Sequence, residues 1–252
     1  MNQRKPIIAG NWKMHKTLDE AIAAARRIVE ITGDVTEVEV LIAPPFTALS
    51  AVAAVIRNSS VQLGGQNLFW EQKGAYTGEI AADMLRSCGC QYVIIGHSER
   101  RQFFGETDET VNRRISAALK GGLVPILCIG ETETQREAGQ TFSVLDKQVR
   151  KGLEGFFAHD LASLVIAYEP VWAIGTGKTA SSDQAQEVHR YLRDLMAKAY
   201  GNALANSIRI LYGGSVKPSN VRELMSMPDL DGALVGGASL DPQSFGQLVH
   251  YQ

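Results

Sequence analysis

The sequence has few cysteines, no long apolar run and no excess of charge of one sign. Cysteine occurs three times in 252 residues, at Cys88, Cys90 and Cys128, which is too sparse for a disulfide framework. No stretch has the length of a membrane-spanning helix, and the first residues lack the apolar run of a secretory signal. We therefore expect free thiols, no membrane insertion and a cytoplasmic location.

Charge and metal-ligand patterns exclude two further classes of partner. The 25 basic and 27 acidic residues give a formal net charge of −2 and are spread along the chain, so no basic surface for nucleic acid is expected. Cys88 and Cys90 have no second ligand pair near them, so we interpret them as two thiols without a metal. We expect no metal and no cofactor.

Short apolar runs and amphipathic stretches alternate along the whole chain. Most of the runs are continuously apolar, as expected for strands covered on both faces of a parallel sheet. The predicted strands are Pro6–Gly10, Val38–Ala43, Val61–Gly65, Tyr92–Gly96, Val124–Gly130, Leu164–Tyr168, Ile208–Tyr212 and Gly232–Gly236. The predicted helices are Thr17–Gly33, Thr47–Asn58, Ile80–Cys88, Thr107–Lys120, Phe142–Phe156, Asp183–Tyr200, Pro218–Met225 and Gln243–Val249.

Eight β-then-α units favour a closed (β/α)₈ barrel of parallel strands with eight outer helices. An open doubly wound sheet is the competing architecture, but no break in composition divides the chain into two halves. We therefore predict one catalytic domain over residues 1–252, with its chemistry at the carboxyl ends of the strands.

Ionisable side chains follow three of the predicted strands. Lys13 comes after the first strand, His97 after the fourth and Glu169 after the sixth. Taken singly, they are better explained as a surface lysine, a structural histidine and a glutamate in a rim salt bridge. A barrel directs all three strand ends toward one mouth, so we expect a lysine, a histidine and a carboxylate to converge.

Glycine pairs follow the seventh and eighth predicted strands. The segments Tyr212–Ser215 and Leu234–Ala238 allow bare backbone amides to approach a ligand closely. Either pair alone is explained by a tight turn. At adjacent strand ends of a barrel the two loops favour phosphate binding.

The segment between Pro170 and Ser181 contains two misleading motifs. Gly177-Lys178-Thr179 resembles the end of a P-loop, but that motif requires glycine where Trp172 stands. The spacing of Gly175, Gly177 and Ala180 loosely fits a dinucleotide fingerprint, but it does not directly follow its strand. We predict instead a lid with small residues at its tip.

These motifs together resemble the triosephosphate isomerase family, and the resemblance spans the chain. It is carried by Asn11-Trp12-Lys13, Gly96–Arg101, the run from Ala167 through Trp172 to Ala180, and the two glycine loops. Two departures stand out: His15 occupies a position where the family often has asparagine, and Ser181-Ser182-Asp183 replaces a more usual Thr-Pro-Glu.

The resemblance implies a TIM barrel and a cofactor-free aldose–ketose isomerase of glycolysis and gluconeogenesis, acting on dihydroxyacetone phosphate and glyceraldehyde 3-phosphate. It implies Glu169 as the base, His97 as a neutral imidazole that polarises the carbonyl, and Lys13 as the countercharge. Supporting and substrate-binding roles are implied for Glu99, Asn11, Gly175, Ser215, Gly236 and Gly237. The loop Gln66 to Glu79 resembles the family's dimer loop, which implies a homodimer.

Two other functions remain open from the residues alone. One is a different phosphate-binding barrel enzyme, such as an aldolase with a Schiff-base lysine. The other is a non-catalytic protein that binds sugar phosphates, because a fold by itself does not prove chemistry.

Overall fold

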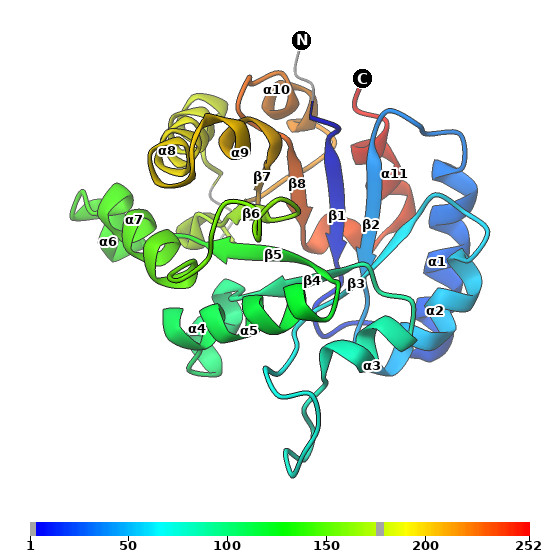
Figure 1. Cartoon of the computed structure of the whole chain (residues 1–252). Helices are drawn as coiled ribbons and strands as arrows, with labels where there is room; N and C mark the ends of the chain where they lie inside the picture. Colours follow the sequence, from blue (N-terminus) through cyan, green and yellow to red (C-terminus); the bar gives the residue numbers. More distant parts are fainter. Residues whose placement is uncertain (1–3, 175–178) are drawn as a thin grey trace.

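The computed structural model describes residues 4–174 and 179–252 and contains a closed barrel (Figure 1). Eight strands follow one another around the barrel in sequence order, and each strand is parallel to both of its neighbours. They are β1 (Ile7–Asn11), β2 (Glu39–Ala43), β3 (Gln62–Gly65), β4 (Tyr92–Ile95), β5 (Val124–Ile129), β6 (Val165–Tyr168), β7 (Arg209–Tyr212) and β8 (Gly232–Val235). The predicted closed barrel and all eight predicted strands are confirmed.

Helices surround the barrel (Figure 1). Those matching the eight predicted helices are α1 (Leu18–Thr32), α2 (Leu49–Ile56), α3 (Ala82–Ser87), α5 (Asp108–Lys120), α7 (Thr141–Gly152), α8 (Ser182–Tyr200), α10 (Val221–Met225) and α11 (Pro242–Val249). The described residues add the short helices α4 (Ser98–Phe103), α6 (Glu133–Glu137) and α9 (Asn202–Ser207), and the 3₁₀ turns η1 (Phe46–Ala48), η2 (Val171–Ala173) and η3 (Gly237–Ser239). The sequence pattern did not indicate the added helices, each of which has only five or six residues.

The core has two layers, which explains why the strands read as continuous apolar runs. Alternate strand residues point to opposite faces of a sheet. In β1, Ile7 and Ala9 belong to the cluster inside the barrel, whereas Ile8 packs in the larger cluster between barrel and helices. Because both faces are dry, burying each large aliphatic side chain contributes about 1.5–3 kcal/mol to folding.

The carboxyl ends of all eight strands open at the same end of the barrel. A long loop after β3, Gln66–Glu79, projects away from the body of the molecule (Figure 1). The pairing of Gly10 with Val235 and of Tyr168 with Tyr212 brings the ends of β1 and β8, and of β6 and β7, side by side. The fold therefore brings the predicted site residues to one mouth. None of the helices in the described residues combines the length and the apolar character of a membrane span.

Candidate active site at the barrel mouth

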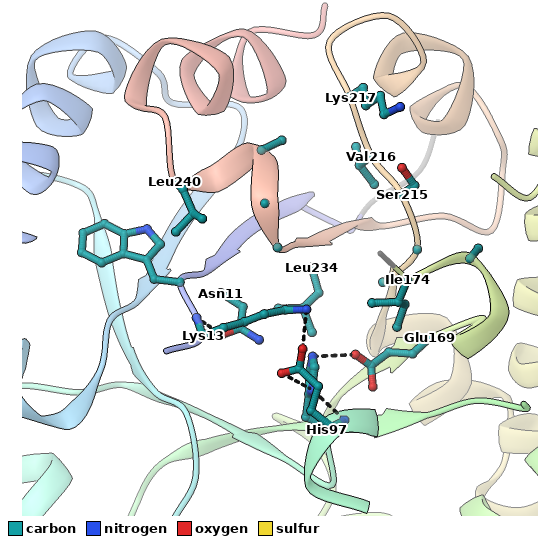
Figure 2. Close-up of a pocket in the computed structure, with 18 of the residues that line it drawn as sticks. Asn11, Lys13, His97, Glu169, Ile174, Ser215, Val216, Lys217, Leu234 and Leu240 are labelled. Carbon is teal, nitrogen blue, oxygen red and sulfur yellow. Dashed lines mark hydrogen bonds and ion pairs between the residues drawn. The ribbon is translucent and has the colours of Figure 1, made fainter. Parts of the chain in front are cut away.

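A cavity of about 490 Å³ lies at the carboxyl ends of the strands (Figure 2). The predicted site residues that the structure describes all line it: Asn11, Lys13, His97, Glu99, Glu169, Ser215, Gly236 and Gly237. Gly175, with the tip of the predicted lid, lies outside the described residues. The expected convergence of Lys13, His97 and Glu169 is therefore present, and Figure 2 shows these three side chains meeting below the glycine loops.

Lys13 is held in an unusual backbone conformation. Its φ of 51° lies in the left-handed region that residues other than glycine rarely adopt. The backbone N–H donates to Oδ1 of Asn11 at 3.0 Å, and the backbone carbonyl accepts from Nε2 of Gln66 at 2.8 Å. The Nζ ammonium forms an ion pair with Oε1 of Glu99 at 2.7 Å. Hydrogen bonds on both sides of the residue thus fix where the ammonium enters the cavity.

His97 caps the amino terminus of α4, and its two ring nitrogens have different partners. Nδ1 accepts a hydrogen bond from the backbone N–H of Glu99 at 3.2 Å. An accepting Nδ1 assigns the proton of the neutral ring to Nε2. Nε2 lies 2.8 Å from Oε1 of Glu169 and donates to it. This arrangement presents an N–H group rather than a lone pair to the interior of the site.

Glu169 is almost fully buried directly after β6. Its backbone N–H continues the β5–β6 ladder by donating to the carbonyl of Ile129 at 2.7 Å. Its carboxylate accepts from Nε2 of His97 and, at 2.8 Å, from the backbone N–H of Ser98. Both carboxylate oxygens are therefore occupied by donors from the β4–α4 turn.

Burial and pairing act on the pKa values of these two groups in opposite directions. Burial alone would raise the pKa of Glu169, but the charge and hydrogen bond of His97, with the Ser98 N–H and Lys13, lower it. Burial alone would lower the pKa of His97, whereas the neighbouring Glu169 carboxylate raises it. Desolvation alone would make Glu169 a stronger base and keep the His97 ring neutral, as the resemblance implies for His97, but contact between the two groups outweighs it here.

Glycines after β5 and β7 make room for Glu169. A methyl group at Gly213 would lie 2.9 Å from Cγ of Glu169, and one at Gly130 would lie 1.7 Å from the Glu169 carbonyl oxygen. Both distances are too short for a side chain. The glycine pattern predicts a tight turn or phosphate binding at Gly213, and it does not reveal the steric role of this residue beside the carboxylate.

The two glycine loops form the opposite wall of the cavity. Gly236 and Gly237 begin the 3₁₀ turn η3, whose first N–H groups have no partner within the turn itself. No heavy atom lies within 4 Å of a methyl group placed on Gly237, so this residue faces open space. Ser215 lies in the neighbouring loop, where Asn220 holds its carbonyl at 3.1 Å. Backbone amides can reach an anion from this wall.

Two further residues that support the site were not assigned from the sequence. Ser98 binds the Glu169 carboxylate through its backbone, which no side-chain pattern reveals. Glu131 is fully buried and accepts hydrogen bonds from Tyr168 and Trp172, which flank Glu169 and Pro170 in the chain. Glu131 follows an apolar strand, as Glu169 does, and that signal could have found it.

The arrangement can move a proton beside a polarised oxygen. It combines a carboxylate that can accept a proton, an imidazole N–H that can stabilise a developing oxyanion, and an ammonium in a partly buried cavity. A wall of backbone amides next to these groups suits a small phosphorylated substrate.

Comparisons with known proteins place this geometry in a family. The family model for triosephosphate isomerase matches residues 6–252. The triosephosphate isomerase of Citrifermentans bemidjiense is 55% identical over 98% of this chain and 99% of its own length, and that of Geobacter metallireducens is 56% identical over 99% of both. The crystal structure of the triosephosphate isomerase from Bartonella henselae superimposes with a TM-score of 0.89 at 39% identity, covering 98% of this chain and all of that one.

The family match, the full-length relatives and the barrel with its cavity agree with one another. The aldolase and the non-catalytic binding protein considered above are not favoured. The chain therefore belongs to the triosephosphate isomerase family and is an isomerase.

Proposed function

We propose that Glu169, His97 and Lys13 carry the isomerase activity, interconverting dihydroxyacetone phosphate and D-glyceraldehyde 3-phosphate through an enediolate. The observation that carries this assignment is the 2.8 Å contact between Nε2 of His97 and Oε1 of Glu169 in a cavity that Lys13 also lines. The reaction moves one proton between two neighbouring carbons and a second proton between the oxygens attached to them. It needs a base, an electrophile and a countercharge.

Glu169 acts as the base. Its carboxylate must leave Nε2 of His97 and the N–H of Ser98 before it can reach a substrate carbon, because both oxygens are engaged. Departure from the imidazole removes the contact that lowers its pKa, and burial then raises its basicity. General-base catalysis of this kind contributes about 10²–10⁴-fold to the rate.

His97 acts as the electrophile. Once Glu169 has moved, Nε2–H is free to donate to the carbonyl or enediolate oxygen, and Nε2 recovers a proton from the neighbouring hydroxyl, which moves the hydroxyl proton between the two oxygens. The pKa of His97 then loses the carboxylate that raises it, and burial favours the neutral ring. The Glu99 N–H donates to Nδ1 and keeps the proton on Nε2, where the substrate oxygen can use it.

Lys13 supplies positive charge to both the oxyanion and the phosphate. Its ion pair with Glu99 holds the ammonium beside the cavity, and Asn11 lies close enough to orient the substrate oxygens. The phosphate rests on amides of Ser215, Gly236 and Gly237, with Gly175 as a further donor. Neutral amides explain how a chain with a net charge of −2 binds an anion.

Replacing Glu169 tests the assignment directly. In a coupled assay with glyceraldehyde 3-phosphate, Glu169→Asp should turn over slowly but measurably, because the shorter side chain withdraws the carboxylate from carbon. Glu169→Gln should be slower still, because an amide accepts no proton. A Glu169→Gln enzyme with wild-type kcat would refute the role of this residue.

We also propose that the chain forms a homodimer through the loop Gln66–Glu79. The loop projects from the barrel (Figure 1), and Tyr76 within it is 45% exposed. Met14 and Met84 add apolar side chains that are 95% and 50% exposed. Sedimentation should give twice the monomer mass of 27.4 kDa, and removing residues 70–79 should give the monomer mass. A monomeric wild-type protein would contradict the proposal.

Two broader assignments complete the proposal. Residues 1–252 form one catalytic domain, supported by a barrel whose strands extend from Ile7 to Val235, so that no half of the chain closes alone. The protein is cytoplasmic, supported by three free thiols at Cys88, Cys90 and Cys128. Fluorescence microscopy of a tagged chain in its own cell tests the second assignment.

A further inference from the structure

Lys16 has a strained backbone in the loop that carries Lys13. Its φ is 76°, and among the described residues only Lys13 is another non-glycine residue with positive φ. Such a conformation is unfavourable for a residue with a side chain and persists where surrounding contacts hold it. The strained backbone of Lys13 is explained by its proposed role in the cavity. The proposed catalytic roles do not explain why Lys16 is strained as well.

The side chain of Lys16 connects two loops of the barrel mouth. Its Nζ donates a hydrogen bond to the backbone carbonyl of Leu240 at 2.8 Å, and it lies 5.4 Å from the ring centroid of Trp12. Leu240 ends the turn η3 that Gly236 and Gly237 begin, and its own N–H donates to the Gly237 carbonyl. Trp12 is fully buried directly before Lys13. One ammonium group thus links the β1–α1 loop to the β8–α11 loop.

The spacing between these two loops matters for the substrate. Lys13 passes close to η3: a methyl group on Gly236 would lie 3.2 Å from Cε of Lys13. The β1–β8 ladder ends at the pairing of Gly10 with Val235, before either loop begins. Beyond the ladder, the hydrogen bond from Lys16 to Leu240 holds the two loops together. In this region the Lys13 ammonium and the Gly236–Gly237 amides must face the same phosphate.

We propose that Lys16 is a positioning residue for substrate binding, which clamps the Lys13 loop to the glycine turn η3. This inference rests on the proposed role of η3 in holding the phosphate. Lys16 does not touch the substrate. It fixes the distance between the Lys13 ammonium and the Gly236–Gly237 amides through the Leu240 carbonyl. Losing the clamp lowers affinity for the phosphorylated ligand and leaves the proton-transfer groups in place.

Four variants separate the clamp from charge and from strain. Lys16→Met keeps an apolar stem over Trp12 but loses the donor, and Lys16→Asn tolerates a positive φ but cannot reach Leu240. Lys16→Arg keeps a donor of similar reach. Lys147→Met, on the exposed face of α7, removes one positive charge away from the mouth and is the matched control.

The first readout is the Kd of glycerol 3-phosphate by calorimetry, because this ligand has no carbonyl to isomerise. Lys16→Met and Lys16→Asn should raise the Kd about fivefold, the factor commonly carried by one net hydrogen bond. KM for glyceraldehyde 3-phosphate should rise in parallel while kcat changes little, the signature of lost uniform binding. Lys16→Arg should restore most of the affinity, and Lys147→Met should match wild type.

Wild-type Kd and KM in both Lys16→Met and Lys16→Asn would overturn the proposal. Equal weakening in Lys147→Met would also overturn it, because the effect would then be one of net charge. Failure of Lys16→Arg to restore affinity would do the same. A wild-type protein that neither binds glycerol 3-phosphate nor isomerises would instead refute the proposed function, which separates the two failures.

Discussion

The two ends of the barrel carry similar charged side chains in different settings. At the amino-terminal end, the fully buried carboxylate of Asp231 accepts from Nε of Arg4 at 2.7 Å, Nη2 of Arg193 at 2.6 Å and the backbone N–H of Ile210 at 2.9 Å. Glu39, also at that end, pairs with Arg209 at 2.7 Å and bonds the hydroxyl of Tyr92. Each of these carboxylates is held by several donors at once.

At the mouth, by contrast, the charged groups border a cavity. Lys13 pairs with Glu99, a side chain that is 39% exposed, and the contact of His97 with Glu169 lies on the cavity wall. A ligand can replace these partners, whereas the Asp231 side chain is 0% exposed and its oxygens are occupied by donors from the protein. The difference lies in what the charged groups border: Asp231 is enclosed by protein donors, whereas the pairs at the mouth line a cavity in which a ligand can meet them.

Removing the imidazole at the mouth should have the largest effect on function. His97→Asn keeps a polar group but cannot supply Nε2–H to a substrate oxygen. We expect kcat per folded molecule to fall by about 10²–10⁴-fold, the usual contribution of a positioned acid or base. His15→Asn is the control, because His15 lines the same cavity but is exposed. The check is steady-state kinetics together with urea unfolding, and a near-normal kcat in His97→Asn would erase the contrast.

Removing the carboxylate at the opposite end should have the reverse pattern. Asp231→Ala leaves Arg4 and Arg193 without their shared partner, and breaking a buried ion pair from one side costs about 3–5 kcal/mol. The free energy of unfolding in urea should fall by that amount, while kcat per folded molecule stays near wild type. Asp34→Ala, at a side chain that is 84% exposed, is the matched control. A large loss of kcat with an unchanged free energy of unfolding would contradict the assignment of Asp231 to stability rather than catalysis.

The sequence was sufficient for the barrel and for the set of residues at its mouth, for a physical reason. Strand runs ending in Lys13, His97 and Glu169 need only the topology of a barrel to bring them together. The partners of Glu169 were out of reach, because the Ser98 N–H is a backbone group and its approach depends on the geometry of one turn. Gly33 shows the same limit. It stands at the C-cap of α1 as expected, but with a φ of −65° rather than in the left-handed form.

Two buried histidines extend the comparison to pH dependence, because their pKa values shift in opposite directions. The Glu169 carboxylate raises the pKa of His97, whereas burial lowers that of His189, between Tyr168 and Tyr212, to about 4. Between pH 6.5 and about 4 the unfolded chain protonates His189 while the folded chain does not, so stability is complete above pH 6.5 and decreases as the pH falls through that window. At 1.36 kcal/mol per pKa unit, the loss is about 3 kcal/mol.

A pH series of urea unfolding experiments tests this loss. His189→Leu should flatten the decline of the free energy of unfolding between pH 6.5 and 4, because the variant has no buried imidazole to keep neutral. His159→Leu is the control, since the His159 side chain is 80% exposed and should leave the slope unchanged. An equal decline in wild type and His189→Leu would show that other groups set the acid limit.

The smallest expected effect concerns Ser182, where this chain departs from the usual proline of the family. Ser182 is the first residue of α8, and its hydroxyl donates to the Glu223 carboxylate on α10. The bond is exposed, so Ser182→Ala should lower the free energy of unfolding by only about 0.5–1 kcal/mol. Ser182→Pro should lie closer to wild type, because proline fits the first helical position and restricts the unfolded chain. A double-mutant cycle that combines Ser182→Ala with Glu223→Ala measures the energy of the Ser182–Glu223 hydrogen bond. A coupling energy near zero would show that this bond gives serine no advantage over proline.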